Sequence, residues 1–203
     1  IEQNQFDTIY HEHFSYFSFY TVSLIFEKHG LELFDVEQIP THGGSLRIYG
    51  KHKEDASKSI SINVADLLKE EAKGMRNIEY YKGFQEQVNE VKINLVSFLL
   101  EQKKLDKKVV AYGAAAKGNT LLNYCGVKND LIEFVVDASP HKQGEYLPGS
   151  HIPIVNEEMI KVNKPNFILI LPWNLIDEII NQLNYVKDWG AKFVLPIPEL
   201  EIL

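Results

Sequence analysis

The sequence has only one cysteine, no long apolar run and no excess of basic side chains, and each shortage argues against a class of protein. Cys125 alone can form neither an internal disulfide nor a zinc site built from cysteines, so a reducing, cytoplasmic setting is expected. No apolar run approaches the roughly 20 residues that cross a bilayer, and no signal peptide is visible, so we expect no membrane partner. Acidic side chains outnumber basic ones by 28 to 21, and the net charge of −7 argues against nucleic acid as a partner.

The sequence also lacks an initiating methionine. It begins at Ile1, and aromatic side chains are already dense between residues 6 and 20. We interpret the chain as the later part of a longer protein whose N-terminal domains are missing; trimmed N-terminal residues are the alternative. Its 203 residues and 45% apolar content suit one or two globular domains.

The first half of the chain predicts a helix, a two-strand hairpin and a helical connector. Apolar positions in residues 20–28 predict a helix that ends at Gly30. Residues 31–38 and 45–50 alternate as strands do, and a Gly-rich turn joins them. After a polar stretch, residues 60–104 carry apolar side chains at helical spacing. We interpret this helical stretch as a bridge and a packing surface.

From residue 105 onward, short apolar strands alternate with helices. This alternation predicts an α/β fold with a parallel sheet and right-handed crossovers, of the Rossmann-like, nucleotide-binding type. The expected strands span residues 109–112, 132–136, 167–171 and 192–195, and a helix is expected over residues 175–186.

A loop of small residues follows the first of these strands and opens a helix. Small residues let a ligand phosphate approach the backbone, and a helix N-terminus supplies unpaired N–H groups. The loop departs from both the Walker A and the G-x-G-x-x-G patterns, and a tight turn without a ligand is the alternative. The expected ligand contacts are Gly113, Ala114, Lys117, Gly118, Asn119 and Thr120.

Two further strand ends place polar side chains at the same rim of the sheet. Asp137 closes the second strand, where an acid often holds a ribose, although it is also a common cap. Lys142 in the following loop offers a cation for a phosphate. Trp173 and Asn174 follow the third strand, at the edge where open α/β sheets bind ligands. Trp173 either stacks on a base or sugar or belongs to the core.

The run Tyr10-His11-Glu12-His13 gathers two imidazoles, a carboxylate and a phenol. Its spacing fits neither the His-Glu-x-x-His zinc motif nor the zinc deaminase signature, so we expect no metal there. A histidine can take up a proton at neutral pH, a neighbouring Glu can orient it, and a Tyr can donate to an oxyanion. Without further context, an aromatic-rich structural turn is the simpler interpretation.

A third group of polar residues lies in the predicted hairpin. The two glycines between His42 and Arg47 permit an unusual backbone or a close approach by another group. His42 and Arg47 are therefore candidates for contacts to a phosphorylated or keto substrate. A hairpin connection with a surface arginine is the alternative.

Taken together and in this order, the motifs resemble the sugar C-methyltransferase family. The resemblance covers essentially the whole chain and is specific for the family, though not for a substrate. The matching stretches are FDTIYHEHFSY at 6–16, HGL at 29–31, HGGSLR at 42–47, GAAAKGNTLLN at 113–123 and HKQGEYLPG at 141–149.

Members of this family are expected to have an N-terminal cysteine-rich zinc domain, a central S-adenosylmethionine domain and a Rossmann-like C-terminal domain. The resemblance implies that residues 1–52 end the S-adenosylmethionine domain of a class I methyltransferase, residues 53–104 connect the domains, and residues 105–203 help to hold a nucleotide-linked sugar. S-adenosylmethionine, and any zinc, would then be bound mainly by the missing N-terminal part. We therefore expect the isolated chain to be inactive in methyl transfer.

The resemblance also implies roles for single residues. His13 would remove the proton from the carbon beside the ketone of a nucleotide-linked keto sugar or similar keto substrate. Glu12 would orient His13 or the sugar, and Tyr10 would stabilise the enolate or position the sugar. The enolate would then attack the methyl group of S-adenosylmethionine. Asn123, in a matching stretch, joins the expected substrate contacts.

Two other functions remain open at this point. The first is a Rossmann-like module that binds a nucleotide or nucleotide-sugar without chemistry. The second is an NAD-dependent oxidoreductase, against which Ala115 and Ala116 argue because they depart from the dinucleotide fingerprint.

Overall fold

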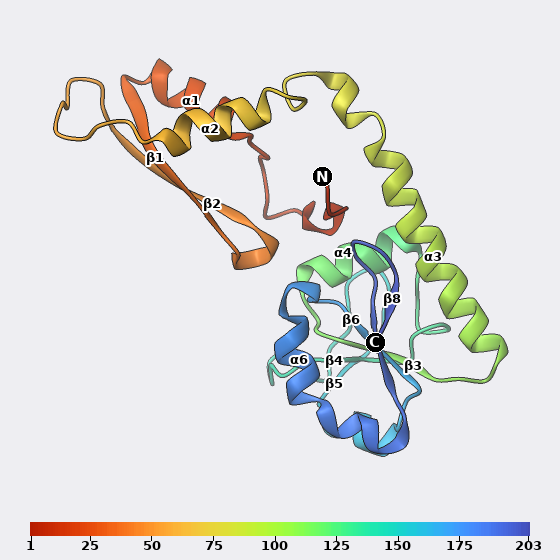
Figure 1. The fold of residues 1–203 in the computed structure, drawn as a ribbon. Coiled ribbons are helices and arrows are strands. Elements are labelled where there is room, and N and C mark those ends of the chain that lie inside the picture. The colour runs from red at the N-terminus through yellow and green to blue at the C-terminus, as the bar shows by residue number, and fades with distance from the viewer. The chain divides into compact units, whose positions relative to one another are not determined.

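The computed structural model describes all residues from 1 to 203 (Figure 1). The chain folds into two compact units, one formed by residues 1–13 together with 84–203 and the other by residues 14–83. No helix has both the length and the apolar character required to cross a bilayer. The assignment of residues 1–52, 53–104 and 105–203 to parts of a complete enzyme stays a prediction.

A six-stranded sheet forms the centre of the larger unit. Its order is β5-β4-β3-β6-β7-β8, and neighbouring strands are parallel except for β8, which is antiparallel to β7. Counted from β3, this order is 3-2-1-4-5-6, which is the order of doubly wound dinucleotide-binding folds. The strands are β3 (Val109–Tyr112), β4 (Val135–Val136), β5 (Ile154–Val155), β6 (Phe167–Ile170), β7 (Lys192–Leu195) and β8 (Glu201–Ile202).

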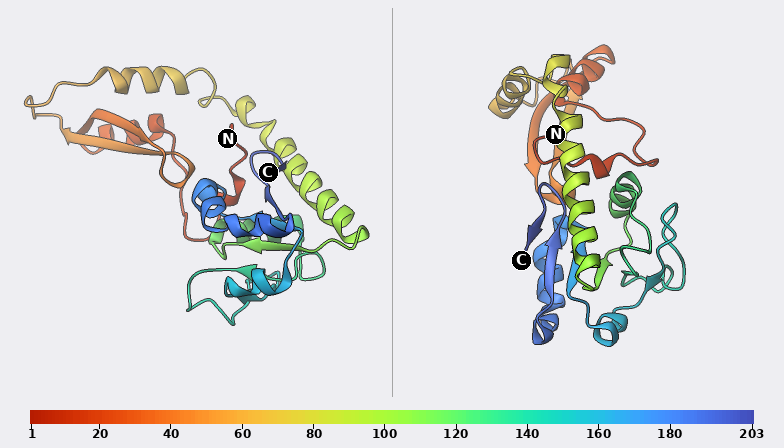
Figure 2. Two further views of the ribbon diagram at one scale, coloured as in Figure 1. Left: turned by 60° about the horizontal axis from the view of Figure 1, so that its bottom comes forward. Right: turned by 90° about the vertical axis from the view of Figure 1, so that its right-hand side faces the viewer.

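Helices cover both faces of this sheet. Successive residues of a strand point to opposite faces, and the apolar side chains on each face are buried under helices. Val109 and Ala111 share a core with α3 (Phe84–Lys104) and α4 (Ala116–Cys125). Val110 lies in a second core with helices on the other face. Figure 2 shows the long helix α3 leading directly into β3. The predicted α/β fold with a mainly parallel sheet is confirmed. The helices of the second core are α5 (Glu158–Asn163), α6 (Ile176–Gln182) and the 3-10 helix η5 (Asn184–Trp189).

The smaller unit is a hairpin whose first strand contacts two helices. The strands β1 (Leu31–Ile39) and β2 (Ser45–His52) are antiparallel, and α1 (Phe19–Lys28) and α2 (Ile62–Glu71) both contact β1. The prediction of a helix followed by two strands is confirmed. The buried core of this unit consists of Phe19, Leu33, Val36 and Val64.

Several predicted elements are shorter or more broken than expected. The strand expected over 132–136 is reduced to Val135–Val136, because Ile132 donates its N–H to Lys128 in a turn. The helical stretch 60–104 is divided into α2, a 3-10 helix η3 (Ile78–Tyr81) and α3. The helix expected over 175–186 is likewise divided between α6 and η5.

Glu71 joins the two helices of the smaller unit through a buried carboxylate. Its two oxygens accept the N–H groups of Phe19 and Tyr20, each at 2.7 Å, and thereby satisfy the first turn of α1. Hydrogen bonds to a charged acceptor are stronger than neutral ones. We expect Glu71→Gln to lower the free energy of unfolding of this unit by about 1–3 kcal/mol, measured by denaturant titration. Glu70→Gln is the control, because Glu70 is exposed and pairs only with Lys73; equal stability of both variants would contradict the prediction.

Candidate functional site

The loop between β3 and α4 is tightly held where it leaves the strand. Gly113 has a φ of +94°, and its N–H donates to the Val136 carbonyl at 2.7 Å. A Cβ on Gly113 would lie 2.5 Å from the ring of Pro172, which follows the neighbouring strand β6. Small residues are needed here because two strand ends meet at close range.

Asp137 follows β4 and turns its carboxylate onto this loop. Oδ2 accepts the Ala114 N–H at 2.8 Å and Lys142 Nζ at 3.1 Å, while Oδ1 accepts the Ser139 N–H at 2.9 Å. Lys142 Nζ also donates to the Ala114 carbonyl at 2.9 Å. Asp137 and Lys142 therefore brace the loop, and the ribose contact expected of Asp137 stays a prediction.

The first turn of α4 has no side-chain cap. Ala115 precedes the helix, and its methyl side chain offers no hydrogen-bond acceptor to the first N–H groups. Such N–H groups, with the positive end of the helix dipole, are suited to an anion. Gly118 allows this turn to approach β6, since a Cβ there would lie 2.6 Å from Leu171 Cβ.

A hollow of about 360 Å³ lies over this loop, entirely within the larger unit. The N-terminal segment forms one part of its wall, the loop and first turns of α4 another, and the segment before β5 a third. The hollow therefore brings residues 10–11 together with residues 114–120, about a hundred positions further along the chain. The lining residues are Tyr10, His11, Ala114, Ala115, Ala116, Asn119, Thr120, His141, Lys142, Glu145, Tyr146, Leu147, Pro148 and Ile154.

Asn123 fastens two walls of this hollow. Its Nδ2 donates to the Asn119 carbonyl at 2.8 Å and to the Pro148 carbonyl at 2.9 Å. The second bond links α4 to the loop of residues 145–148. Asn123 itself is not among the lining residues, but its two bonds support the positions of Asn119 and Pro148, which are.

The rim beyond β6 carries Trp173 and Asn174, as the sequence predicted for this strand end. Lys117 Nζ lies 4.4 Å from the centroid of the Trp173 ring and 3.4 Å from Asn174 Oδ1. Burial lowers the pKa of Lys117, and the nearby Asp7 carboxylate opposes this shift. Trp173 Nε1 donates to Asp7 Oδ2 at 2.7 Å, so the indole is a bridge between the rim and the N-terminal segment.

The Tyr10–His13 segment is folded so that its first and last rings meet. The ring centroids of Tyr10 and His13 lie 4.1 Å apart, and the His13 N–H donates to the Tyr10 carbonyl at 2.9 Å. His13 Nδ1 lies 2.8 Å from the Thr8 carbonyl, which can only accept, so Nδ1 is a protonated nitrogen and the neutral form of the ring has its lone pair on Nε2. Glu12 is exposed and lies 4.0 Å from His11 Nε2.

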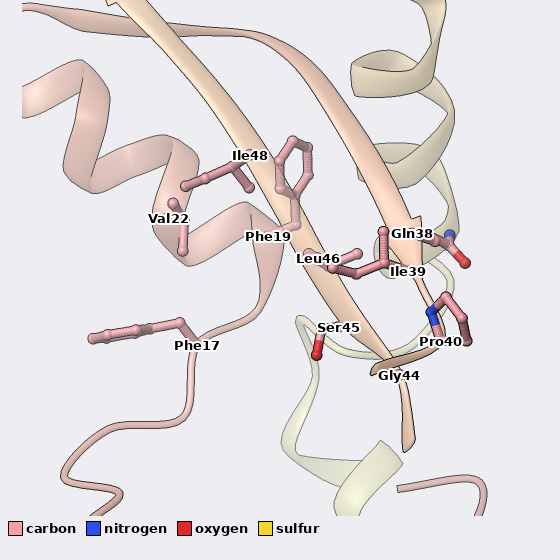
Figure 3. A pocket seen from close by; sticks show the side chains of 10 residues that line it. All are labelled: Phe17, Phe19, Val22, Gln38, Ile39, Pro40, Gly44, Ser45, Leu46 and Ile48. Atoms are coloured by element: carbon pink, nitrogen blue, oxygen red, sulfur yellow. The ribbon is translucent and has the colours of Figure 1, made fainter. Parts of the chain in front are cut away.

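His42 and Arg47 belong to the smaller unit, whereas the residues described above belong to the larger one. His42 is exposed in the hairpin turn, with a φ of 58°, and Arg47 Nη1 pairs with Glu37 Oε2 at 3.1 Å across the hairpin. Beside this turn is an open hollow of about 850 Å³ with a mainly apolar lining (Figure 3). Neither His42 nor Arg47 lines it. Its lining residues are Phe17, Phe19, Val22, Gln38, Ile39, Pro40, Gly44, Ser45, Leu46 and Ile48.

Sequence reasoning missed several residues of the larger unit's site. Asp7 stands three residues before Tyr10, but nothing in its neighbours indicates a buried carboxylate. His141 and Tyr146 lie in a stretch that carried the family resemblance, and they line the hollow. Thr8 contributes a backbone carbonyl, which a sequence motif does not reveal.

Comparison with known proteins gives two findings. A family model described as the C-methyltransferase C-terminal domain matches residues 40–198. The chain is also 36% identical to the C-methyltransferase NovU of Streptomyces niveus over 204 aligned positions. That alignment covers 100% of this chain and 48% of the relative, so the chain spans about half the length of the protein that it matches.

Proposed function

The chain belongs to the C-methyltransferase family, and we propose that it forms the C-terminal part of an enzyme that methylates a carbon next to a ketone in a nucleotide-linked sugar. In this proposal the larger unit binds the nucleotide-sugar and supplies the base.

One observation carries the proposal: Tyr10 and His11 line the same hollow as the loop between β3 and α4. The uncapped first turn of α4 suits a diphosphate, and His141 and Lys142, which line the same hollow, add nitrogen donors. The Tyr10–His13 segment then stands where the sugar joined to that diphosphate would extend. A pocket at this strand end is also where doubly wound folds bind their ligands.

The segment contains the groups that enolate formation requires. Nε2 of His13 takes the proton from the carbon next to the ketone; the electron pair of that C–H bond forms the C=C bond of the enolate, while the π electrons of the C=O bond move onto the ketone oxygen. The Tyr10 hydroxyl stabilises the resulting negative charge by donating a hydrogen bond. Glu12 is assigned to the sugar, because the Thr8 carbonyl already orients His13. The enolate carbon is the nucleophile that C-methylation needs.

Membership in this family implies S-adenosylmethionine as the methyl donor, and we place its binding outside residues 1–203. The strand–loop–helix after β3 is the one glycine-containing loop of this type in the chain. We assign this loop to the nucleotide-sugar, so no second loop of this type is left for the cofactor. The residues present therefore do not fit this cofactor, and the steps above concern only the keto sugar.

Calorimetric titration of the 203-residue chain with thymidine diphosphate tests the placement of the nucleotide. We expect binding to the wild-type chain and roughly threefold to tenfold weaker binding to His141→Ala, because His141 lines the hollow. His29→Ala is the matched control, since His29 is an exposed histidine of the smaller unit. Titrations with NAD and S-adenosylmethionine run in parallel.

Tight binding of NAD in place of thymidine diphosphate would favour an oxidoreductase and reject the proposal. Failure to bind any of the three ligands would reject the placement of the nucleotide in this hollow. Binding that is equally strong in the wild type and in His141→Ala would move the nucleotide to another surface of the chain.

A further inference from the structure

Asp7 is a fully buried carboxylate that the proposed chemistry does not use. It lies in the 3-10 helix η1 (Phe6–Thr8), which packs against α4, and its exposed fraction is 0%. Oδ2 accepts the indole N–H of Trp173 at 2.7 Å, whereas Oδ1 is buried without a hydrogen-bond partner. Burial raises the pKa of Asp7, and the Trp173 hydrogen bond and the positive charge of Lys117 oppose this rise.

Anchoring of the N-terminal segment does not explain this carboxylate. Phe6 is already inserted in the main core, with a ring centroid 5.0 Å from that of Tyr124, and Asn4 Nδ2 donates to the Pro198 carbonyl at 3.1 Å. Burying an acid with one unsatisfied oxygen opposes folding, and an apolar residue would anchor the segment at lower cost. Unlike an apolar side chain, the carboxylate forms a directional hydrogen bond, and the indole N–H of Trp173 thereby fixes its position.

The backbone next to Asp7 is hydrogen-bonded to the proposed reacting residues, which lie within six positions of it. The next residue, Thr8, uses its carbonyl to hold His13 Nδ1 at 2.8 Å, and the same carbonyl accepts the Tyr10 N–H at 3.2 Å. The His13 N–H in turn donates to the Tyr10 carbonyl. A rotation of the backbone at Asp7 would therefore move the Thr8 carbonyl and both rings together.

We infer that Asp7 is a positioning residue: its bond to Trp173 fixes the η1 backbone on the rim beyond β6, and this places Tyr10 at the substrate hollow with His13 beside it. Lys117 contributes to the same arrangement, because its ammonium group lies over the Trp173 ring, at 4.4 Å from the ring centroid. This inference rests on the proposed function, in which Tyr10 and His13 act on the keto sugar.

Kinetics of the full-length enzyme that carries this chain test the inference. Asp7→Ala and Trp173→Phe each remove one half of the bond, and we expect each to lower kcat on the order of 10- to 100-fold with little change in KM. Asp7→Asn retains an oxygen for the indole and should keep kcat within about threefold of the wild type. The double variant Asp7→Ala/Trp173→Phe should be no slower than Asp7→Ala, since both changes break the same bond.

Trp189→Phe and Asp130→Asn are the matched controls. Trp189 Nε1 is likewise a partly buried hydrogen-bond donor, but its acceptor is the Pro165 backbone carbonyl at 3.0 Å, and Trp189 is not among the residues that line the hollow. Asp130 is an exposed acid of the same unit. Neither control should change kcat. A purely structural role for Asp7 would lower the melting temperature and leave kcat per folded enzyme unchanged, and that result would overturn the inference.

Hydrogen exchange in the 203-residue chain gives a readout that does not depend on catalysis. Asp7→Ala and Trp173→Phe should raise amide exchange in residues 8–13 while residues 109–125 stay protected. Unchanged exchange in residues 8–13 would overturn the inference even if the wild-type enzyme is active. Loosening of this segment in the variants, together with a wild-type enzyme that lacks C-methyltransferase activity, would instead count against the proposed function alone.

Discussion

Replacing His13 with alanine should lower kcat for C-methylation in the full-length enzyme by about 10²- to 10⁴-fold, the usual contribution of a general base. His13 Nδ1 donates a hydrogen bond to the Thr8 carbonyl, so the lone pair of the neutral imidazole is on Nε2, where it can accept the proton. KM should change far less, because His13 lies beside the hollow and is not among its lining residues. Steady-state rates with varied nucleotide-sugar measure both quantities.

His11→Ala is the matched control for this prediction. His11 is two residues away and lines the hollow, but its side chain is 87% exposed and lies near Glu12. Its loss should raise KM more than it lowers kcat. If His11→Ala showed the larger fall in kcat, the base would have to be assigned to His11 and the role of the Thr8 carbonyl would be lost.

Proton removal can also be followed without methyl transfer. In deuterated water and without a methyl donor, the wild-type enzyme should exchange the hydrogen on the carbon next to the ketone, and His13→Ala should not exceed the uncatalysed rate. Exchange at the wild-type rate in His13→Ala would show that another group is the base. The measurement thus separates the deprotonation step from every later one.

The sequence predicted the sheet where its strands are buried on both faces and long enough to show an apolar run. The expected strands at 109–112 and 192–195 agree with β3 and β7 residue for residue. The strands β5 and β8 were missed because each has two residues, too few to show a periodicity. The helix α5 was missed because its six residues make fewer than two turns. Their places in the sheet depend on tertiary packing.

The local segments of the candidate site could be predicted from the sequence, but the hydrogen bonds that join them could not. The loop from Gly113 and the Tyr10–His13 segment were both recognisable from residue types, yet the bond between Asp7 and Trp173 joins positions that are 166 residues apart. No local pattern indicates such a contact. The direction of the Asp137 side chain was equally hidden, because an acid that braces a loop and one that holds a ribose occupy the same place in the sequence.

Gly113→Ala should destabilise the larger unit by about 2–6 kcal/mol, because two separate costs apply at this position. A φ of +94° is strained for any residue with a Cβ, at about 1–3 kcal/mol. The new Cβ would also lie 2.5 and 2.7 Å from Cδ and Cγ of Pro172, whose ring cannot rotate away, and overpacking of this kind costs about 1–3 kcal/mol more. Denaturant titration of the 203-residue chain measures the loss.

Gly126→Ala separates the two costs. Gly126 ends α4 with a φ of +75°, and a Cβ there would meet nothing within 4 Å, so only the backbone strain applies. Gly126→Ala should therefore be the milder change, and it should leave binding of thymidine diphosphate intact, whereas Gly113→Ala should weaken that binding by displacing the loop. Equal losses in both variants would mean that Pro172 moves aside at no cost. The close contact between the ends of β3 and β6 would then not be what holds the loop in position for a ligand.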